Sequence, residues 1–120
     1  MLERIQGLPD NVLGIEATGE VTGADYEAVL IPAVEEAIVR QNNLRFLYHL
    51  GDKFSGFDAK AIWDDAKIGL QYVNAWERVA VVTDVAWIHT AVKVFGFAIP
   101  GQVRVFGNSN LQEAISWLST

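Results

Sequence analysis

The spacing of apolar residues in this chain changes repeatedly between a period of two and a period near 3.6. In NVLGIEATGEV, residues 11–21, apolar residues alternate with polar residues or glycine: Leu13, Ile15, Ala17 and Val21. This alternation is typical of a strand with one buried face. A weaker strand, LERIQGL, precedes it, and the turn-forming stretch PDN lies between them. Because proline presets φ and Asp and Asn tolerate turn conformations, the two strands are predicted to pair as an antiparallel hairpin.

Four helical stretches follow, separated by strands. The first begins at Thr22, which has capping-box spacing with Asp25, and Pro32 is expected to kink or break it. The intervening strands are LRFLYHL, RVAVVTD and QVRVF. Helical segments of about 10 to 18 residues between strands indicate βαβ crossovers and a mostly parallel sheet. The predicted fold is α/β with element order ββαβαβαβα, in one domain spanning residues 1–120.

The other three helices are predicted from apolar stripes and capping residues. The helix over residues 59–73 carries a stripe that is expected to face the core: Ala59, Ile62, Trp63, Ala66, Leu70 and Val73. Its charged residues, Asp64 among them, are expected on the solvated side. Asp84 is expected to cap the next helix, and Ser109 with Gln112 to form a capping box for the last.

The two faces of the predicted sheet differ in polarity. Three strands carry a polar or mixed alternate row, which contains Glu16, Thr18, Arg45, His49 and Arg104. A parallel sheet covered by helices on both faces would be apolar on both. We therefore expect helices mainly on one face, with the other partly solvated or available for association.

Composition excludes several classes of protein. Hydrophobic residues make up 51% of the 120 residues, which indicates a packed core and not a disordered chain. The net charge of -6 and the scattered Lys and Arg residues oppose nucleic acid as a partner. The absence of cysteine is compatible with a reducing cytoplasm, and the first ten residues lack the apolar core of a signal peptide. No apolar stretch reaches the ~20 residues that a membrane-spanning helix needs. We expect a cytoplasmic protein.

Several segments carry a resemblance to a known family. The element order, together with ADYEAVLIPAVEEAI, AIWDDAK, WERVAVVTDVAWI and EAISWL, resembles the SpoIIAA-like family of small bacterial proteins. That family is grouped with STAS (anti-sigma-factor antagonist-like) and SEC14-like lipid-binding domains. Trp76-Glu77-Arg78, AVVTD and Trp87 are the most specific part. The resemblance implies a superhelix of β-α units, a STAS-like regulatory or interaction role and, by analogy with SEC14-like domains, a lipid-like ligand.

Polar residues gather where the parallel strands end. The carboxyl ends of such strands form the usual ligand rim of an open α/β sheet. The predicted partner- or ligand-binding rim contains Asp52, Lys53, Ser55, Asp84 and Asn108, and Thr22 and Ser109 lie at the same edge. In STAS switch proteins, an Asp-Ser pair at the end of the corresponding strand carries the phosphorylated serine. Here Asp52 is followed by Lys53, and Ser55 comes two residues later. Ser55 is therefore a loop residue or cap, with a phosphosite as the alternative.

Catalytic and metal-binding signatures are missing from the sequence. A nucleophilic Ser55 would need a base, and the two candidates, His49 and His89, belong to no known serine-hydrolase motif. The histidines also lack acids at metal-ligand spacing, and no glycine-rich phosphate loop is present. We predict no metal, no cofactor and no catalytic residue.

Surplus apolar residues suggest two functions. Tyr72, Trp76, Val94 and Trp117 fall off the predicted stripes, and FGFAIPG adds apolar side chains in a loop. The leading hypothesis is a non-catalytic STAS-like module that binds a protein partner or itself as a homodimer. The alternative is a binder of a small apolar or lipid-like ligand in a crevice near Trp63, Trp87, Phe95 and Phe97.

Overall fold

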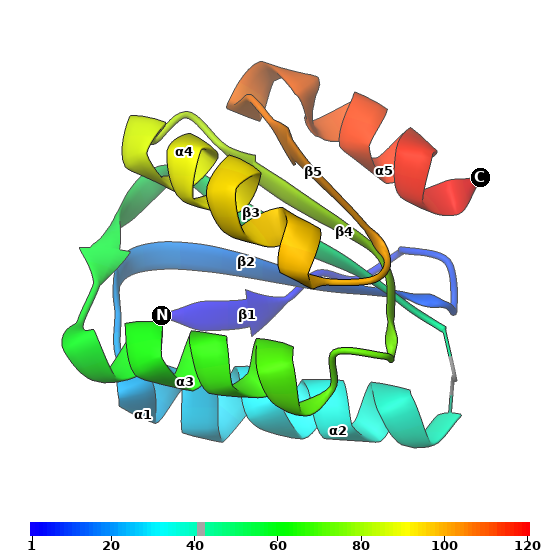
Figure 1. The fold of residues 1–120 in the computed structure, drawn as a ribbon. Helices are drawn as coiled ribbons and strands as arrows, with labels where there is room; N and C mark the ends of the chain where they lie inside the picture. The colour runs from blue at the N-terminus through cyan, green and yellow to red at the C-terminus, as the bar shows by residue number, and fades with distance from the viewer. Residues whose placement is uncertain (41–42) are drawn as a thin grey trace.

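A five-stranded sheet with helices on both faces forms the molecule (Figure 1). The computed structural model describes residues 1–40 and 43–120, with Phe95 described by its backbone alone. The strands are β1 (Leu2–Arg4), β2 (Val12–Val21), β3 (Leu44–Phe57), β4 (Trp76–Thr83) and β5 (Gln102–Phe106). The α-helices are α1 (Gly23–Asp25), α2 (Ile31–Arg40), α3 (Ala59–Gln71), α4 (Ala86–Phe95) and α5 (Leu111–Ser119). A π-helical segment η1 (Tyr26–Leu30) and two 3-10 segments, η2 (Gly96–Ala98) and η3 (Asn108–Asn110), complete the order.

The sheet has the predicted topology. Its strand order is β1-β2-β3-β4-β5, in which β1 is antiparallel to β2 and the other neighbouring pairs are parallel. Helical segments connect β2 to β3, β3 to β4 and β4 to β5, as crossovers between parallel neighbours require. The α/β fold with an N-terminal hairpin is confirmed.

The first helix continues from Gly23 to Arg40, and its hydrogen-bond pattern changes before Pro32 where a kink or break was predicted. Thr22 and Asp25 form the predicted capping box, in which each side chain accepts a hydrogen bond from the other residue's backbone N–H. The helix then continues as η1, and the Ile31 N–H bonds the carbonyl of Tyr26 five residues earlier. Pro32 follows at the second position of α2. Because proline has no N–H to donate, the change of hydrogen-bond spacing occurs just before it.

The third strand is longer than predicted. LRFLYHL was expected to end near Gly51, but β3 continues to Phe57, and its last residues pair with β2 through Gly19↔Phe54 and Val21↔Phe57. The pairing shifts register around Gly19. The long β2 offers unpaired backbone groups beside this segment, and ladder hydrogen bonds satisfy them. Ser55 is therefore a strand residue, and the prediction of a turn or cap at this position is wrong.

Two predicted caps are also wrong. Asp84 does not cap α4, whose N-cap is Val85, and Ser109 does not cap α5, whose N-cap is Asn110. The Thr83 hydroxyl accepts a 3.1 Å hydrogen bond from the Val85 N–H. The Asp84 carboxylate accepts one from the backbone N–H of Asn108, which follows β5. The 3-10 turn η3 displaces the start of α5 beyond Ser109.

Each sheet face has its own apolar core. One core contains Ile15, Tyr48 and Val81 together with residues of η1, α2, α3 and α4. The other contains Leu47, Val82 and Phe106 beneath α5. The helices thus lie mainly on one face, as the polar row indicated, and α5 alone covers part of the other (Figure 1). This arrangement leaves the β1–β2 side of the second face uncovered.

Candidate functional site

Three predicted rim residues meet at the carboxyl ends of the parallel strands. Oδ1 of Asp84 accepts a 2.9 Å hydrogen bond from the backbone N–H of Asn108. The Asn108 amide in turn donates through Nδ2 to Oδ1 of Asp52 over 3.5 Å. The Oδ1 atom of Asn108 is buried and has no hydrogen-bond partner among the residues that the structure describes. The rim therefore contains an unsatisfied acceptor beside two carboxylates.

The other two rim residues are placed differently. Lys53 lines the same cavity as Asp52 and Asn108. Ser55 is exposed on the extension of β3, outside the residues that line this cavity. The N-cap of α3 is Asp58, whose Oδ1 accepts from Ala61 N–H at 2.7 Å and from Gly23 N–H at 3.1 Å. A phosphosite at Ser55 stays a prediction.

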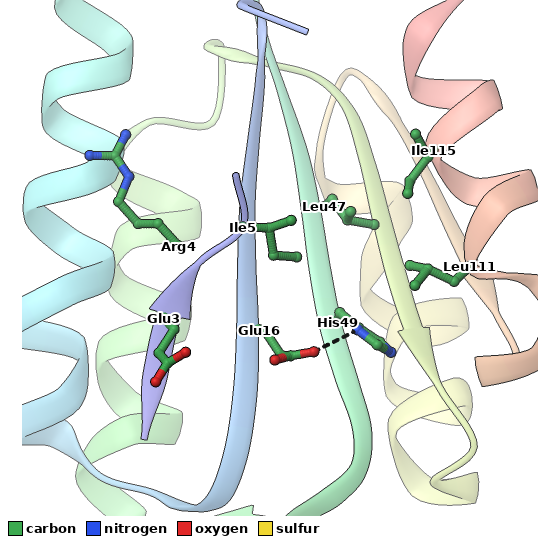
Figure 2. A pocket seen from close by; sticks show the side chains of 8 residues that line it. All are labelled: Glu3, Arg4, Ile5, Glu16, Leu47, His49, Leu111 and Ile115. Carbon is green, nitrogen blue, oxygen red and sulfur yellow. Dashed lines mark ion pairs between the residues drawn. The ribbon is translucent and has the colours of Figure 1, made fainter. Parts of the chain in front are cut away.

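A groove crosses the uncovered part of the second sheet face. A cavity of about 620 Å³ at the rim and a second of about 250 Å³ farther along the strands share Glu3, Glu16 and His49. These three residues are consecutive cross-strand neighbours, through Glu3↔Glu16 and Glu16↔His49. In Figure 2, β1 borders the smaller cavity on one side and Leu111 and Ile115 of α5 on the other. The polar row was visible in the sequence, but the contribution of Glu3 was not, because it depends on the hairpin register.

His49 and Glu16 form a pair on the floor of this groove. Nδ1 of His49 lies 3.3 Å from Oε2 of Glu16, as the dashed line in Figure 2 marks. A hydrogen on Nδ1 would point at the carboxylate. The second ring nitrogen, Nε2, takes no part in this contact. A Cβ atom on Gly51 would lie 3.3 Å from Nε2, so the glycine leaves the edge of the imidazole open.

The apolar stripe of α3 faces outward, contrary to the prediction. Ile62, Trp63 and Leu70 are 53%, 66% and 68% exposed. The inward side instead carries Ala61, Asp64 and Ile68, of which Asp64 is only 6% exposed. The Lys60 ammonium group forms ion pairs with Asp64 at 3.2 Å and with Glu27 at 2.6 Å. Periodicity located the helix correctly but assigned its faces in reverse, because the surface beneath it is polar at Asp65 and the core contacts come from Ala61 and Ile68.

A chain of hydroxyl groups forms that polar surface. The Tyr26 hydroxyl donates to Oδ1 of Asp65 at 2.8 Å and lies 2.8 Å from the Tyr48 hydroxyl. Burial raises the pKa of both tyrosines, and the charge of Asp65 raises them further. Asp65 is exposed when all its atoms are counted together. Its carboxyl group is nevertheless surrounded by protein, and this desolvation raises the pKa of the carboxyl. The hydrogen bond from Tyr26 acts in the opposite direction.

Further apolar side chains are exposed on and after α4. Trp87, Val94 and Phe97 are 53%, 50% and 85% exposed. The Trp87 ring meets Phe57, at the end of β3, edge to face with 6.2 Å between centroids. The side chain of Phe95, also predicted for the apolar crevice, lies outside the described residues. We define the α3/α4 face as Ile62, Trp63, Leu70, Trp87, Val94 and Phe97.

The remaining histidine makes a structural contact. Nε2 of His89 bonds the backbone carbonyl of Thr83, which joins α4 to the end of β4. Among residues 1–40 and 43–120, no group of three or more His, Cys, Asp or Glu side chains has metal-binding geometry. No helix in the same ranges is long and apolar enough to cross a membrane.

Comparison with known proteins assigns the fold to a family. The model of the SpoIIAA-like family matches residues 12–119. A solved structure of an uncharacterised protein with a SpoIIAA-like fold, from Shewanella loihica PV-4, superposes with a TM-score of 0.78 and 26% sequence identity. The match covers 98% of this chain and 92% of the other. No curated protein matches the sequence. The chain belongs to the SpoIIAA-like family.

Proposed function

We propose that the protein is a non-catalytic interaction module that binds a protein partner, or a second copy of itself, through the α3/α4 face. The single observation that carries this proposal is the reversed amphipathicity of α3. Leu70 is 68% exposed and Trp63 66%, while Asp64 on the same helix is 6% exposed. Exposed apolar side chains that group into one patch mark protein interaction sites, whereas single ones are ordinary on monomer surfaces.

The composition of this face fits a protein interface. Tryptophan provides large contact area with one polar atom and is enriched among residues that dominate binding energy. The face carries Trp63 and Trp87 on two helices that cover the same side of the sheet. Lys60 and Lys67 lie on α3 beside the stripe and would supply the polar rim of such an interface.

Self-association gives the direct test. Analytical ultracentrifugation over a range of concentrations should show a monomer–dimer equilibrium that Leu70→Lys and Trp63→Lys abolish. Val39→Lys is the matched control, since Val39 is 88% exposed on α2 and is not one of the six residues of this face. A purified wild-type protein that stays monomeric and carries no co-purifying partner would reject the proposal.

A second candidate function is binding of a small apolar or lipid-like ligand near Trp63, Trp87 and Phe97. The contact of Phe57 with the half-exposed Trp87 favours it, because Phe57 also packs on Phe54 with 4.9 Å between ring centroids. A ligand here would rest on a cluster of tilted aromatic rings. Native mass spectrometry and thermal shift with fatty acids would detect it, and Trp87→Ala should remove the shift. Unliganded protein with no shift would leave the interaction module as the function.

A further inference from the structure

The groove on the opposite sheet face is independent of the α3/α4 face. We propose that it binds a small organic cation, such as a primary amine, that carries an apolar group. Its polar end contains the row Glu3, Glu16 and His49, and its other end is apolar, with Leu47 on the floor and Leu111 and Ile115 on α5 (Figure 2). The larger of its two cavities, about 620 Å³, is in the size range of small-molecule sites, and the smaller, about 250 Å³, continues it along the strands.

The charge of the ligand follows from the acids in that row. Glu3 and Glu16 are directly opposite each other on antiparallel strands, where like charges repel. Glu16 has one ionic partner, the imidazole of His49, and no ion pair among the described residues includes Glu3. A cation placed between the two carboxylates would relieve this repulsion, whereas an anion would increase it.

The hydrogen-bonding groups favour a donor. Glu3, Glu16 and Asp52 offer carboxylate oxygens, and Asn108 adds a buried Oδ1 atom that has no partner among the described residues. Nδ2 of Asn108 faces the Asp52 carboxylate over 3.5 Å, so Oδ1 is the amide atom without a partner. A buried acceptor without a donor is costly, so a ligand that donates hydrogen bonds into the cavity would stabilise the site.

The existing cations leave this end of the groove open. Lys53 lies at the exposed margin. The amino group of Met1 is already bonded to the Thr18 carbonyl at 2.7 Å and lies 3.5 Å from the Asp25 carboxylate. Arg4 pairs with Glu36 on α2, and Figure 2 shows its side chain directed away from the groove.

The apolar residues at the other end of the groove are the reason that the proposed ligand carries an apolar group. Gly14 on β2 has no side chain, and a Cβ atom there would meet Leu8 at 2.4 Å and Ile5 at 3.1 Å. These two residues therefore pack over the strand, and Ile5 lines the groove opposite α5. A ligand with its ammonium at Glu16 would place a short apolar group between Ile5 and Ile115.

Three probes of one shape but different charge separate the outcomes. Amide chemical shifts of the full chain would be followed during titration with 2-phenylethylamine, 2-phenylethanol and 3-phenylpropionate at low salt. We expect the amine to bind with saturable shifts at Glu16, Leu47 and His49, and the alcohol and the acid to bind at least about tenfold more weakly, as the loss of a charge-assisted contact predicts. Equal shifts from the alcohol would overturn the cationic preference, and no saturation below about 10 mM amine would overturn the site.

Variants that keep the shape of the groove complete the test. Glu16→Gln and Glu3→Gln should each weaken amine binding about tenfold. Glu35→Gln removes the same charge from α2 on the other side of the sheet and should leave affinity within about twofold. Equal losses in all three variants would show a nonspecific effect of net charge and reject the site. Because α3 and α4 are untouched, self-association would be unaffected, so failure here and failure of the proposed interaction module are distinguishable.

Discussion

The hydroxyl of Tyr26 donates a hydrogen bond of 2.8 Å to Oδ1 of Asp65. Since this hydroxyl has only one hydrogen, the 2.8 Å contact with Tyr48 must use the hydrogen of Tyr48. A directed chain therefore runs from β3 through η1 to α3. With the Lys60–Glu27 ion pair, it holds the acidic side of α3 inward and so turns its apolar stripe toward solvent.

Removal of the central hydroxyl should destabilise the protein. Tyr26→Phe leaves Asp65 and the Tyr48 hydroxyl without their buried partner, at an expected cost of about 1–3 kcal/mol in the free energy of unfolding. Urea denaturation followed by circular dichroism measures this cost. Tyr72→Phe is the control, because the Tyr72 hydroxyl is exposed and its contact with Glu35 is 3.5 Å long. A similar loss in both variants would contradict a special role for the Tyr26 chain.

Ionisation of Asp65 should make the free energy of unfolding depend on pH. Burial raises the pKa of this carboxyl above its ordinary 3.8, so folding favours the protonated form. Its contribution to stability is therefore complete below that value and declines as pH rises through the raised pKa of the folded state. Asp65→Asn keeps an acceptor for Tyr26 and cannot ionise. Relative to wild type, it should gain stability as pH rises above the ordinary pKa of 3.8 and through the raised pKa of the folded state.

Asp25 should give a pH dependence of stability with the opposite sign to that of Asp65. The backbone hydrogen bond from Thr22 is the main cause that lowers the pKa of Asp25 below 3.8. Its contribution is present above that ordinary value and is lost as pH falls through the lowered pKa. Asp25→Asn should therefore be less stable than wild type near neutral pH and approach it in acid. Slopes of the same sign in Asp65→Asn and Asp25→Asn would refute this account.

Arginines of the sheet should stabilise the last helix. Nη1 of Arg45 donates to the Leu118 carbonyl and Nη1 of Arg78 to the Trp117 carbonyl, each at 2.6 Å, and α5 has no basic residue in its own last turn. These contacts satisfy terminal carbonyls and place positive charge at the negative end of the helix dipole. Arg45→Met should cost about 1–3 kcal/mol and speed hydrogen exchange in α5.

Arg104 is the comparison for that variant. Its guanidinium stacks on Phe106 and Trp117, at 4.7 and 5.1 Å from the ring centroids. Stacking at an exposed site is worth about 0.5–1 kcal/mol, so Arg104→Met should have the smaller effect on α5. Equal exchange rates in wild type and Arg45→Met would show that the sheet does not hold this helix.

Local sequence pattern predicts those features of the fold that depend on neighbouring residues. The hairpin, the capping box at Thr22 and the change of helix type before Pro32 each follow from residues a few positions apart. The extension of β3 does not, because it depends on free backbone groups of β2, which lies far away in the sequence. Likewise, the rim residues Asp52, Asp84 and Asn108 were found from strand ends, while Glu3 entered the groove only through the hairpin register.

The orientation of α3 could not be predicted from its own residues. Hydrophobicity places Ile62, Trp63 and Leu70 on one side of the helix, and the usual inference turns that side toward the core. Here the inner surface presents the hydroxyl of Tyr26, and Asp65 bonds it. Only the tertiary arrangement of η1, β3 and α3 shows that Asp65 satisfies this hydroxyl while Ala61 and Ile68 make the apolar contacts of the helix.

Two substitutions on α3 decide between these orientations. Ile68 was not part of the predicted stripe, yet it is only 6% exposed and packs in the core with Tyr26, whereas Leu70 belongs to the stripe and is 68% exposed. Ile68→Ala should therefore cost about 2–4 kcal/mol through lost burial and a cavity, and Leu70→Ala less than about 0.5 kcal/mol. Urea denaturation at a concentration where the protein is monomeric measures both, so that loss of an interface does not contribute. The reverse ranking would mean that the apolar stripe faces the core, and the α3/α4 face would lose its basis as a binding surface.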